Sequence, residues 1–181
     1  GIAVMQGYHA ENTPADVGVV VIGRNEGERL RVCLKGVPFA DCAVVYVDSG
    51  STDGSLQFAQ RCGAHAVALD PAAGFTAARA RNAGLQALLE IAPGTAFVQF
   101  LDGDCELDPG WLARGAAFLR ESPQYAVVSG RVRERDPAGS VFNRLCEWEW
   151  QTPVGDADAC GGNALMRVSA FVAAQGFCET L

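Results

Sequence analysis

The chain has 181 residues, a formal net charge of −7 and 49% hydrophobic residues. This length and apolar content fit one domain with its own core and exclude a disordered chain. No basic face is visible, which argues against a nucleic-acid partner, and no apolar run approaches the roughly 20 residues of a membrane-spanning helix.

Residues 1–16 lack the basic start of a secretory signal, so we expect a flexible leader there. The seven cysteines are odd in number, and no two stand at C-x-x-C spacing. With only two histidines in the chain, this pattern disfavours a zinc site and favours reduced thiols.

Short apolar runs rich in Val alternate with amphipathic segments. We expect strands at 17–22, 42–47, 65–69, 96–101 and 125–129. The expected helices follow the first four strands, at 30–37, from about 54 to 62, at 74–91 and at 109–121. This order predicts an α/β fold with a doubly wound, mostly parallel sheet and helices on both faces.

The regular alternation ends near Arg131. Beyond it we expect a helix at 141–151, a loop at 153–158, a strand at 161–167 and a short helix at 169–175. Trp148 and Trp150 could stack on a sugar or lipid acceptor, although packing in a core is the safer interpretation.

Polar, glycine-containing segments follow three of the expected strands, at 23–26, 48–53 and 102–104. Ligands of open α/β sheets bind beyond the carboxyl ends of the strands. Each segment alone could be an ordinary turn or a helix cap, because Asp, Asn and Gly dominate turns. Their recurrence at successive strand ends favours a ligand site.

Asp102 and Asp104, separated by one glycine, suit a hard divalent cation. Mg²⁺ is often held by one or two carboxylates together with substrate phosphates, so a diphosphate ligand fits this pattern. The sequence has no P-loop, no G-x-G-x-x-G after the first strand and no G-x-S-x-G elbow. These absences argue against a P-loop NTPase, a dinucleotide-binding fold and an α/β hydrolase.

Six segments, in the family's order and rough spacing, resemble family 2 glycosyltransferases with the A-type nucleotide-sugar-binding fold. They are VVVIGRNEGERL at 19–30, VYVDSGSTDGS at 45–55, ARNAGL at 80–85, VQFLDGD at 98–104, CGGNALMR at 160–167 and GFCE at 176–179. The resemblance implies a single domain over 17–181, with a nucleotide-binding half at 17–130 and the start of an acceptor-binding part at 131–181.

The resemblance also implies roles for individual residues. The nucleobase and ribose pocket would be lined by Ile22, Arg24, Asn25 and Glu26. Asp48, followed by Ser49, would bind the base, commonly uracil, and Arg81 would lie near the base or the diphosphate.

On the metal side, Asp102 would contact the ribose or a metal-bound water, with Gly103 beside it. Asp104 would ligate Mn²⁺ or Mg²⁺ bridging the diphosphate, and Asp102 is the second candidate ligand. The donor sugar and the acceptor would lie near Gly161, Gly162 and Asn163.

The implied reaction moves a sugar, with inversion and metal assistance, from a nucleoside-diphosphate donor to a hydroxyl acceptor on a glycan or lipid-linked molecule. UDP is the favoured nucleotide, and the implied setting is bacterial cell-envelope polysaccharide synthesis. The implied location is the cytoplasm, with peripheral association at the inner membrane face as a second option.

The family's catalytic base, a carboxylate, is expected beyond Leu181. Glu179 is a weak candidate, and we interpret the chain as ending inside a family motif. A nucleotide-sugar-binding module without turnover is the alternative function. A nucleotidyltransferase is a weaker rival, because its Gly-rich, Lys-bearing start is missing after the first strand.

Overall fold

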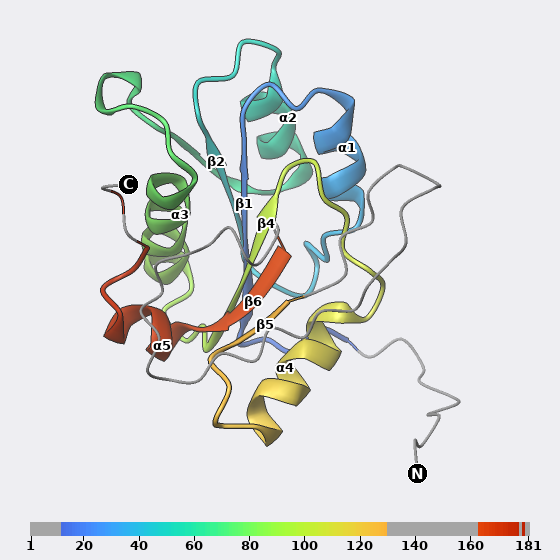
Figure 1. The fold of residues 1–181 in the computed structure, drawn as a ribbon. Helices are drawn as coiled ribbons and strands as arrows, with labels where there is room; N and C mark the ends of the chain where they lie inside the picture. Colours follow the sequence, from blue (N-terminus) through green and yellow to red (C-terminus); the bar gives the residue numbers. More distant parts are fainter. Residues whose placement is uncertain (1–11, 130–162, 178, 180–181) are drawn as a thin grey trace, which may run out of the picture.

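The computed structural model describes residues 12–129, 163–177 and 179 (Figure 1). In chain order its elements are β1 (Val17–Gly23), α1 (Glu28–Lys35), β2 (Val44–Asp48), α2 (Ser55–Cys62), β3 (His65–Ala68), the 3₁₀ turn η1 (Pro71–Ala73), α3 (Ala77–Ile91), β4 (Phe97–Asp102), α4 (Trp111–Glu121), β5 (Val127–Ser129), β6 (Asn163–Arg167) and α5 (Val168–Ala173). The helix expected at 141–151 lies outside the described residues.

The strands form one sheet in the order β3-β2-β1-β4-β6-β5. β1 lies in parallel between β2 and β4, and β3 extends the parallel part beyond β2. β6 is inserted antiparallel between β4 and β5, which makes the sheet mixed. The expected α/β fold with a mostly parallel sheet is confirmed.

Helices cover both faces of the sheet (Figure 1). Alternate residues of β1 point to opposite faces, so Val19 and Val21 join a core with α1, α2 and α4, whereas Val20 and Ile22 join a core with α3 and α5. Because both faces are covered, β1 is a continuous apolar run rather than an alternating one.

Local backbone signals explain two of the helix starts that differ from the sequence expectation. α3 begins at Ala77 and not at Gly74, because Thr76 is its N-cap and its hydroxyl accepts the Arg79 N–H. α4 begins at Trp111 after Gly110, whose φ of 75° is left-handed, so Pro109 precedes the helix. α2 begins at Ser55 with Gly54 as its N-cap, close to its expected start near 54.

The close approach of α3 to the sheet depends on a glycine in the middle of the helix. A Cβ at Gly84 would lie 2.3 Å from Val20 Cγ1 and 3.0 Å from Val47 Cγ2. Val20 and Val47 belong to β1 and β2, the strands whose ends form the site described below. Gly84 therefore sets how near α3 lies to these two strands.

We predict that Gly84→Ala lowers the free energy of unfolding by about 1–3 kcal/mol, the usual cost of overpacking a core. The better helix propensity of Ala offsets only part of this cost. Gly94→Ala is the matched control, because a Cβ there meets nothing within 4 Å, and it should change stability by less than about 0.5 kcal/mol. Urea denaturation measures both, and equal stabilities would contradict the close helix–sheet contact.

Candidate functional site

Strand register brings the three polar segments to one edge of the sheet. Gly23 of β1 pairs with Asp48 of β2, and Ile22 pairs with Asp102 of β4. Backbone hydrogen bonds continue past the strands, from Ser49 N to Gly23 O at 3.0 Å and from Gly103 N to Ile22 O at 2.8 Å. The loops after β1, β2 and β4 therefore begin side by side at the same edge of the sheet.

An open pocket lies at this edge. Its lining comes from the ends of β1, β2 and β4 and from the start of α3: Ile22, Gly23, Arg24, Glu26, Ser49, Phe75, Thr76, Ala77, Ala80, Asp102 and Asp104. The sequence-predicted residues Ile22, Arg24, Glu26, Ser49, Asp102 and Asp104 thus line one cavity. Asn25, Asp48, Arg81 and Gly103 are not in that lining.

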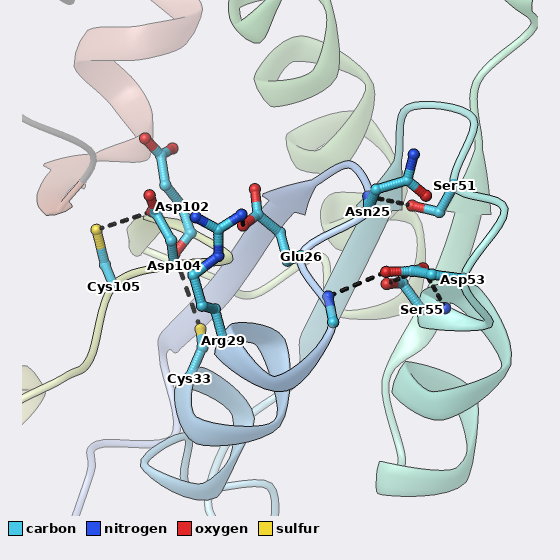
Figure 2. Close-up of polar contacts among 11 residues, drawn as sticks. Asn25, Glu26, Arg29, Cys33, Ser51, Asp53, Ser55, Asp102, Asp104 and Cys105 are labelled. Carbon is cyan, nitrogen blue, oxygen red and sulfur yellow. Dashed lines mark hydrogen bonds and ion pairs between the residues drawn. The ribbon is translucent and has the colours of Figure 1, made fainter.

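Three carboxylates gather beside the pocket (Figure 2): Glu26 from the β1–α1 loop, Asp102 from the end of β4 and Asp104 from the loop that follows it. Burial raises the pKa of Glu26, and the charges of Asp104 and Asp102 raise that pKa further. The guanidinium of Arg29, 3.0 Å from Glu26 Oε2, lowers it. The Arg29 contact lacks hydrogen-bond geometry, so the buried Oε2 has no hydrogen-bond partner among the described residues. Asp102 and Asp104 are therefore close enough for their charges to act on Glu26.

Asp102 is anchored by a cation from the opposite side. Arg81 of α3 is only 9% exposed, and its Nη2 lies 3.2 Å from Asp102 Oδ1. Burial raises the pKa of Asp102, and the Arg81 guanidinium partly offsets that rise. The ion pair orients the Asp102 carboxylate and leaves its Oδ2 without a hydrogen-bond donor among the described residues.

Asp104 is the exposed member of the group. The thiol of Cys105 lies 3.5 Å from its Oδ1, and Cys33 donates to the backbone carbonyl of Asp102 at 3.8 Å (Figure 2). Burial raises the pKa of Cys105 to about 12 and that of Cys33 still higher. Both thiols therefore stay protonated at neutral pH, so neither is an activated nucleophile.

Hydrogen bonds join the β1–α1 loop to the β2–α2 loop (Figure 2). Asn25 N donates to Ser51 Oγ at 2.9 Å, and Asn25 Oδ1 accepts Thr52 N at 2.7 Å. Gly27 N donates to Asp53 Oδ2 at 3.0 Å. Asp53 also accepts the amide and hydroxyl of Ser55, and these bonds lower its pKa. We call these contacts the loop clasp.

Asp48 lies beneath this clasp and is 3% exposed. Its Oδ1 accepts the Tyr46 hydroxyl at 3.0 Å, and its Oδ2 accepts Ser51 N at 2.8 Å. Burial raises the pKa of Tyr46, and the Asp48 charge adds to the rise, so the phenol remains a donor. Asp48 therefore organises the turn that carries Ser49 to the pocket.

Sequence reasoning missed the wall that Phe75 contributes. Its ring lies over the β2–α2 loop, where a Cβ at Gly50 would be 2.8 Å from Phe75 Cζ, and Arg24 stacks on it with Cζ 5.1 Å from the ring centroid. The missed signal was Thr76, a typical N-cap residue. Starting the helix there leaves Phe75 in the loop at the carboxyl edge of the sheet.

Two expected residues lie away from the pocket lining. Asn163 is 1% exposed in β6, where it accepts Gln99 Nε2, and Gln99 in turn accepts Trp111 Nε1 at 2.8 Å. Glu179 accepts Asn82 Nδ2 at 2.7 Å. Gly161 and Gly162, and the Trp148/Trp150 pair, lie outside the described residues.

No group of three or more His, Cys, Asp or Glu side chains within 12–129, 163–177 and 179 is arranged to hold a metal ion. The pair Asp102 and Asp104 still offers two oxygen donors, Oδ2 of each, that accept no hydrogen bond from a described residue. A cation bound there would need its remaining ligands from a bound molecule or water. In the same ranges no helix is both long enough and apolar enough to span a bilayer.

The fold and the order of these motifs agree with a sequence-family match. The family model described as glycosyl transferase family 2 matches residues 18–173, and the chain belongs to this family. Among curated proteins, the glycosyltransferase AglE of Haloferax volcanii is 31% identical over 135 residues, which is 69% of this chain and 42% of AglE.

Solved structures show the same fold. The mannosyltransferase PcManGT from Pyrobaculum calidifontis, in complex with GDP-Man and Mn²⁺, matches with a TM-score of 0.66 at 21% identity over 96% of this chain and 52% of its own. S. aureus TarS 1-349, in complex with UDP, matches with a TM-score of 0.62 at 21% identity over 88% of this chain and 48% of its own. The chain thus spans about half the length of these relatives.

We predict that loss of the Asn25 side chain loosens the loop clasp. Asn25 has a φ of 49°, in the left-handed region. Asn25→Gly keeps that backbone but loses the bond to Thr52, and should lower the free energy of unfolding by about 0.5–1.5 kcal/mol. Asn25→Ala should cost about 0.5–1 kcal/mol more, because a left-handed Ala is strained by more than the entropy that Gly adds to the unfolded chain. Chemical denaturation compares the two, and an Ala variant as stable as the Gly variant contradicts this account.

Proposed function

We propose that the protein binds a nucleoside-diphosphate sugar in this pocket, with UDP favoured as the nucleotide, and takes part in transferring the sugar to a hydroxyl acceptor with inversion. The acceptor would be a glycan or a lipid-linked molecule. The observation that carries the proposal is the pair Asp102 and Asp104, which lines a pocket at the carboxyl end of β4 beside Glu26. Family membership and the fold shared with PcManGT and TarS support it.

Charge is the strongest argument for a divalent cation. Glu26 is paired with Arg29 and Asp102 with Arg81, whereas Asp104 makes no ion pair with a described residue, so a diphosphate that approaches Asp104 would meet local repulsion. Two carboxylates with available oxygens fit Mg²⁺ or Mn²⁺, whose remaining ligands would be diphosphate oxygens and water. When bound, such a cation neutralises charge on the departing nucleoside diphosphate.

The nucleoside would occupy the part of the pocket away from Asp104. Ile22, Gly23 and Arg24 form its β1 side, and Ser49 its β2 side. The predicted base-binding role of Asp48 would act through the turn that brings Ser49 to the pocket, because Asp48 itself is 3% exposed and outside the pocket lining. Phe75, under Arg24, would supply the flat wall.

The chain's own residues would divide the remaining work. Arg81 holds Asp102 in place, and Asn25 keeps the nucleoside loops together. Removal of the acceptor proton would fall to a carboxylate base. Glu179 stays a weak candidate, because its carboxylate already accepts Asn82. In this proposal 17–130 is the nucleotide-binding half and 131–181 begins the acceptor part.

We predict that UDP binds in a cation-dependent way. In titration calorimetry the affinity for UDP should rise on addition of Mn²⁺, and Asp104→Asn should reduce the Mn²⁺-supported affinity by about 10–100-fold, the range seen when one group that supports a metal is lost. Glu90→Gln is the control, since it removes one negative charge from an exposed position on α3 outside the pocket, and it should bind like the unmodified protein.

Affinity for UDP that is unaffected by chelator, or by Asp104→Asn, would contradict the role of the acidic pair. GDP run in parallel tests the base: tighter binding of GDP would overturn only the preference for UDP. Binding of nucleotide sugar without transfer to any hydroxyl acceptor would favour the alternative of a binding module.

A further inference from the structure

The side chain of Asn82, on α3, forms hydrogen bonds with a segment 95 residues further along the chain. Its Nδ2 donates to Phe177 O at 2.9 Å and to Glu179 Oε1 at 2.7 Å, and its Oδ1 accepts Phe177 N at 2.8 Å. One amide thus uses both its donor and its acceptor on the backbone of one residue. A neutral amide is the side-chain group that offers both in this fixed geometry.

The segment is shaped to accept these hydrogen bonds. Gly176 has a φ of 83°, and a Cβ there would lie 2.8 Å from Asn82 Oδ1. Any other residue would therefore be strained in its backbone and would also push the amide away. Through its contacts with Gly176, Phe177 and Glu179, Asn82 joins α3 to the chain beyond α5.

These hydrogen bonds hold the Phe177 ring between two phenylalanine rings and the Arg81 guanidinium. Phe177 makes edge contacts with Phe100, at 5.2 Å between centroids, and with Phe171, at 5.1 Å. The Phe177 ring also contacts Arg81, whose guanidinium carbon lies 5.6 Å from the ring centroid, within the range of a cation–π interaction. Phe100 stands on β4 two residues before Asp102.

Arg81 joins this ring to the acidic pair. It is 9% exposed, with one side against Phe177 and its Nη2 at 3.2 Å from Asp102 Oδ1. A shift of the Phe177 ring would change the packing of the buried Arg81 guanidinium. The position of the Asp102 carboxylate would then change too, because Asp102 is hydrogen-bonded to α3 through Arg81. Of two consecutive residues, Asn82 therefore holds Phe177 and Arg81 links Phe177 to Asp102.

We infer that Asn82 is a positioning residue that couples docking of Gly176 and Phe177 to donor binding at Asp102, through Phe177 and Arg81. This inference rests on the proposed function, since the donor is the ligand that Asp102 meets. Coupling between sites is reciprocal, so a bound donor must hold the segment more firmly and a docked segment must tighten donor binding.

The test combines UDP calorimetry in Mn²⁺ with amide hydrogen exchange at Phe177 followed by NMR. In the unmodified protein, UDP with Mn²⁺ should slow exchange of the Phe177 amide by about fivefold or more, the lower end of typical couplings. Asn82→Ala should abolish this donor-dependent slowing and weaken UDP binding by about the same factor. Gln86→Ala, an exposed amide of the same helix one turn later, is the control and should do neither.

A second pair of variants tests the geometry without removing the side chain. Asn82→Asp keeps the acceptor for Phe177 N but loses both donors and sets a carboxylate against Glu179. It should weaken UDP binding as Asn82→Ala does. Adding Glu179→Gln restores a donor across the same gap and should recover part of the affinity and of the Phe177 protection. A role confined to stability would not produce this recovery.

The outcomes separate the two proposals. If the unmodified protein binds no nucleoside diphosphate, the proposed function fails and the coupling fails with it. If it binds UDP with Mn²⁺ but Asn82→Ala shows the same affinity and the same donor-dependent slowing at Phe177, the coupling alone is overturned. A variant with faster Phe177 exchange but unchanged UDP affinity also overturns it, because docking would then be independent of the donor.

Discussion

The register of β1 against its two parallel neighbours determines where the polar groups of the pocket lie. β1 is buried on both faces, so a slip by one residue would exchange the two sets of core side chains. The pairing that avoids this sets Gly23 beside Asp48 and Ile22 beside Asp102. Packing of apolar side chains therefore fixes the level at which the loops of the site begin.

The loops themselves are held by polar contacts that apolar packing does not supply. Asn25 and Asp53 bind backbone amides across the gap between two loops, and Asp48 binds the amide of Ser51. These amides would otherwise lack partners in their loops, and a backbone N–H needs one. The pocket edge is thus prepared by three side chains that take little direct part in its lining.

The sequence predicted the strands well, and it predicted that their polar carboxyl-end segments meet at one edge of the sheet, because both follow from local signals. Val-rich runs mark buried strands, and the segments after Ile22, Val47 and Leu101 contain the residues that end strands and begin loops. The carboxyl-edge rule for parallel sheets then brings Asp102 and Glu26 together without knowledge of their distance. The family expected from the sequence motifs is confirmed by the family model.

What the sequence did not reveal are contacts between distant segments. The antiparallel insertion of β6 beside β4 depends on packing of residues such as Leu165 in a core built mostly from earlier elements. Nothing near Asn82 in the sequence indicates Phe177, and nothing near Arg81 indicates Asp102. These pairs lie 95 and 21 residues apart, and propensity and periodicity carry no information at that range.

The two aspartates of the acidic pair differ in a way that bears on how the site would bind a charged ligand. Asp102 ends a strand, is partly buried and is held by Arg81, so its position is set before any ligand arrives. Asp104 follows Gly103, where a Cβ would lie tightly against Glu26 Cγ and Ile22 O, at 3.2 Å from each, and the Asp104 side chain is exposed. A preorganised group costs little entropy to engage, whereas an exposed one can adjust to the ligand. The site therefore combines one fixed oxygen donor with one adaptable donor, which suits a cation whose other ligands come from a bound diphosphate.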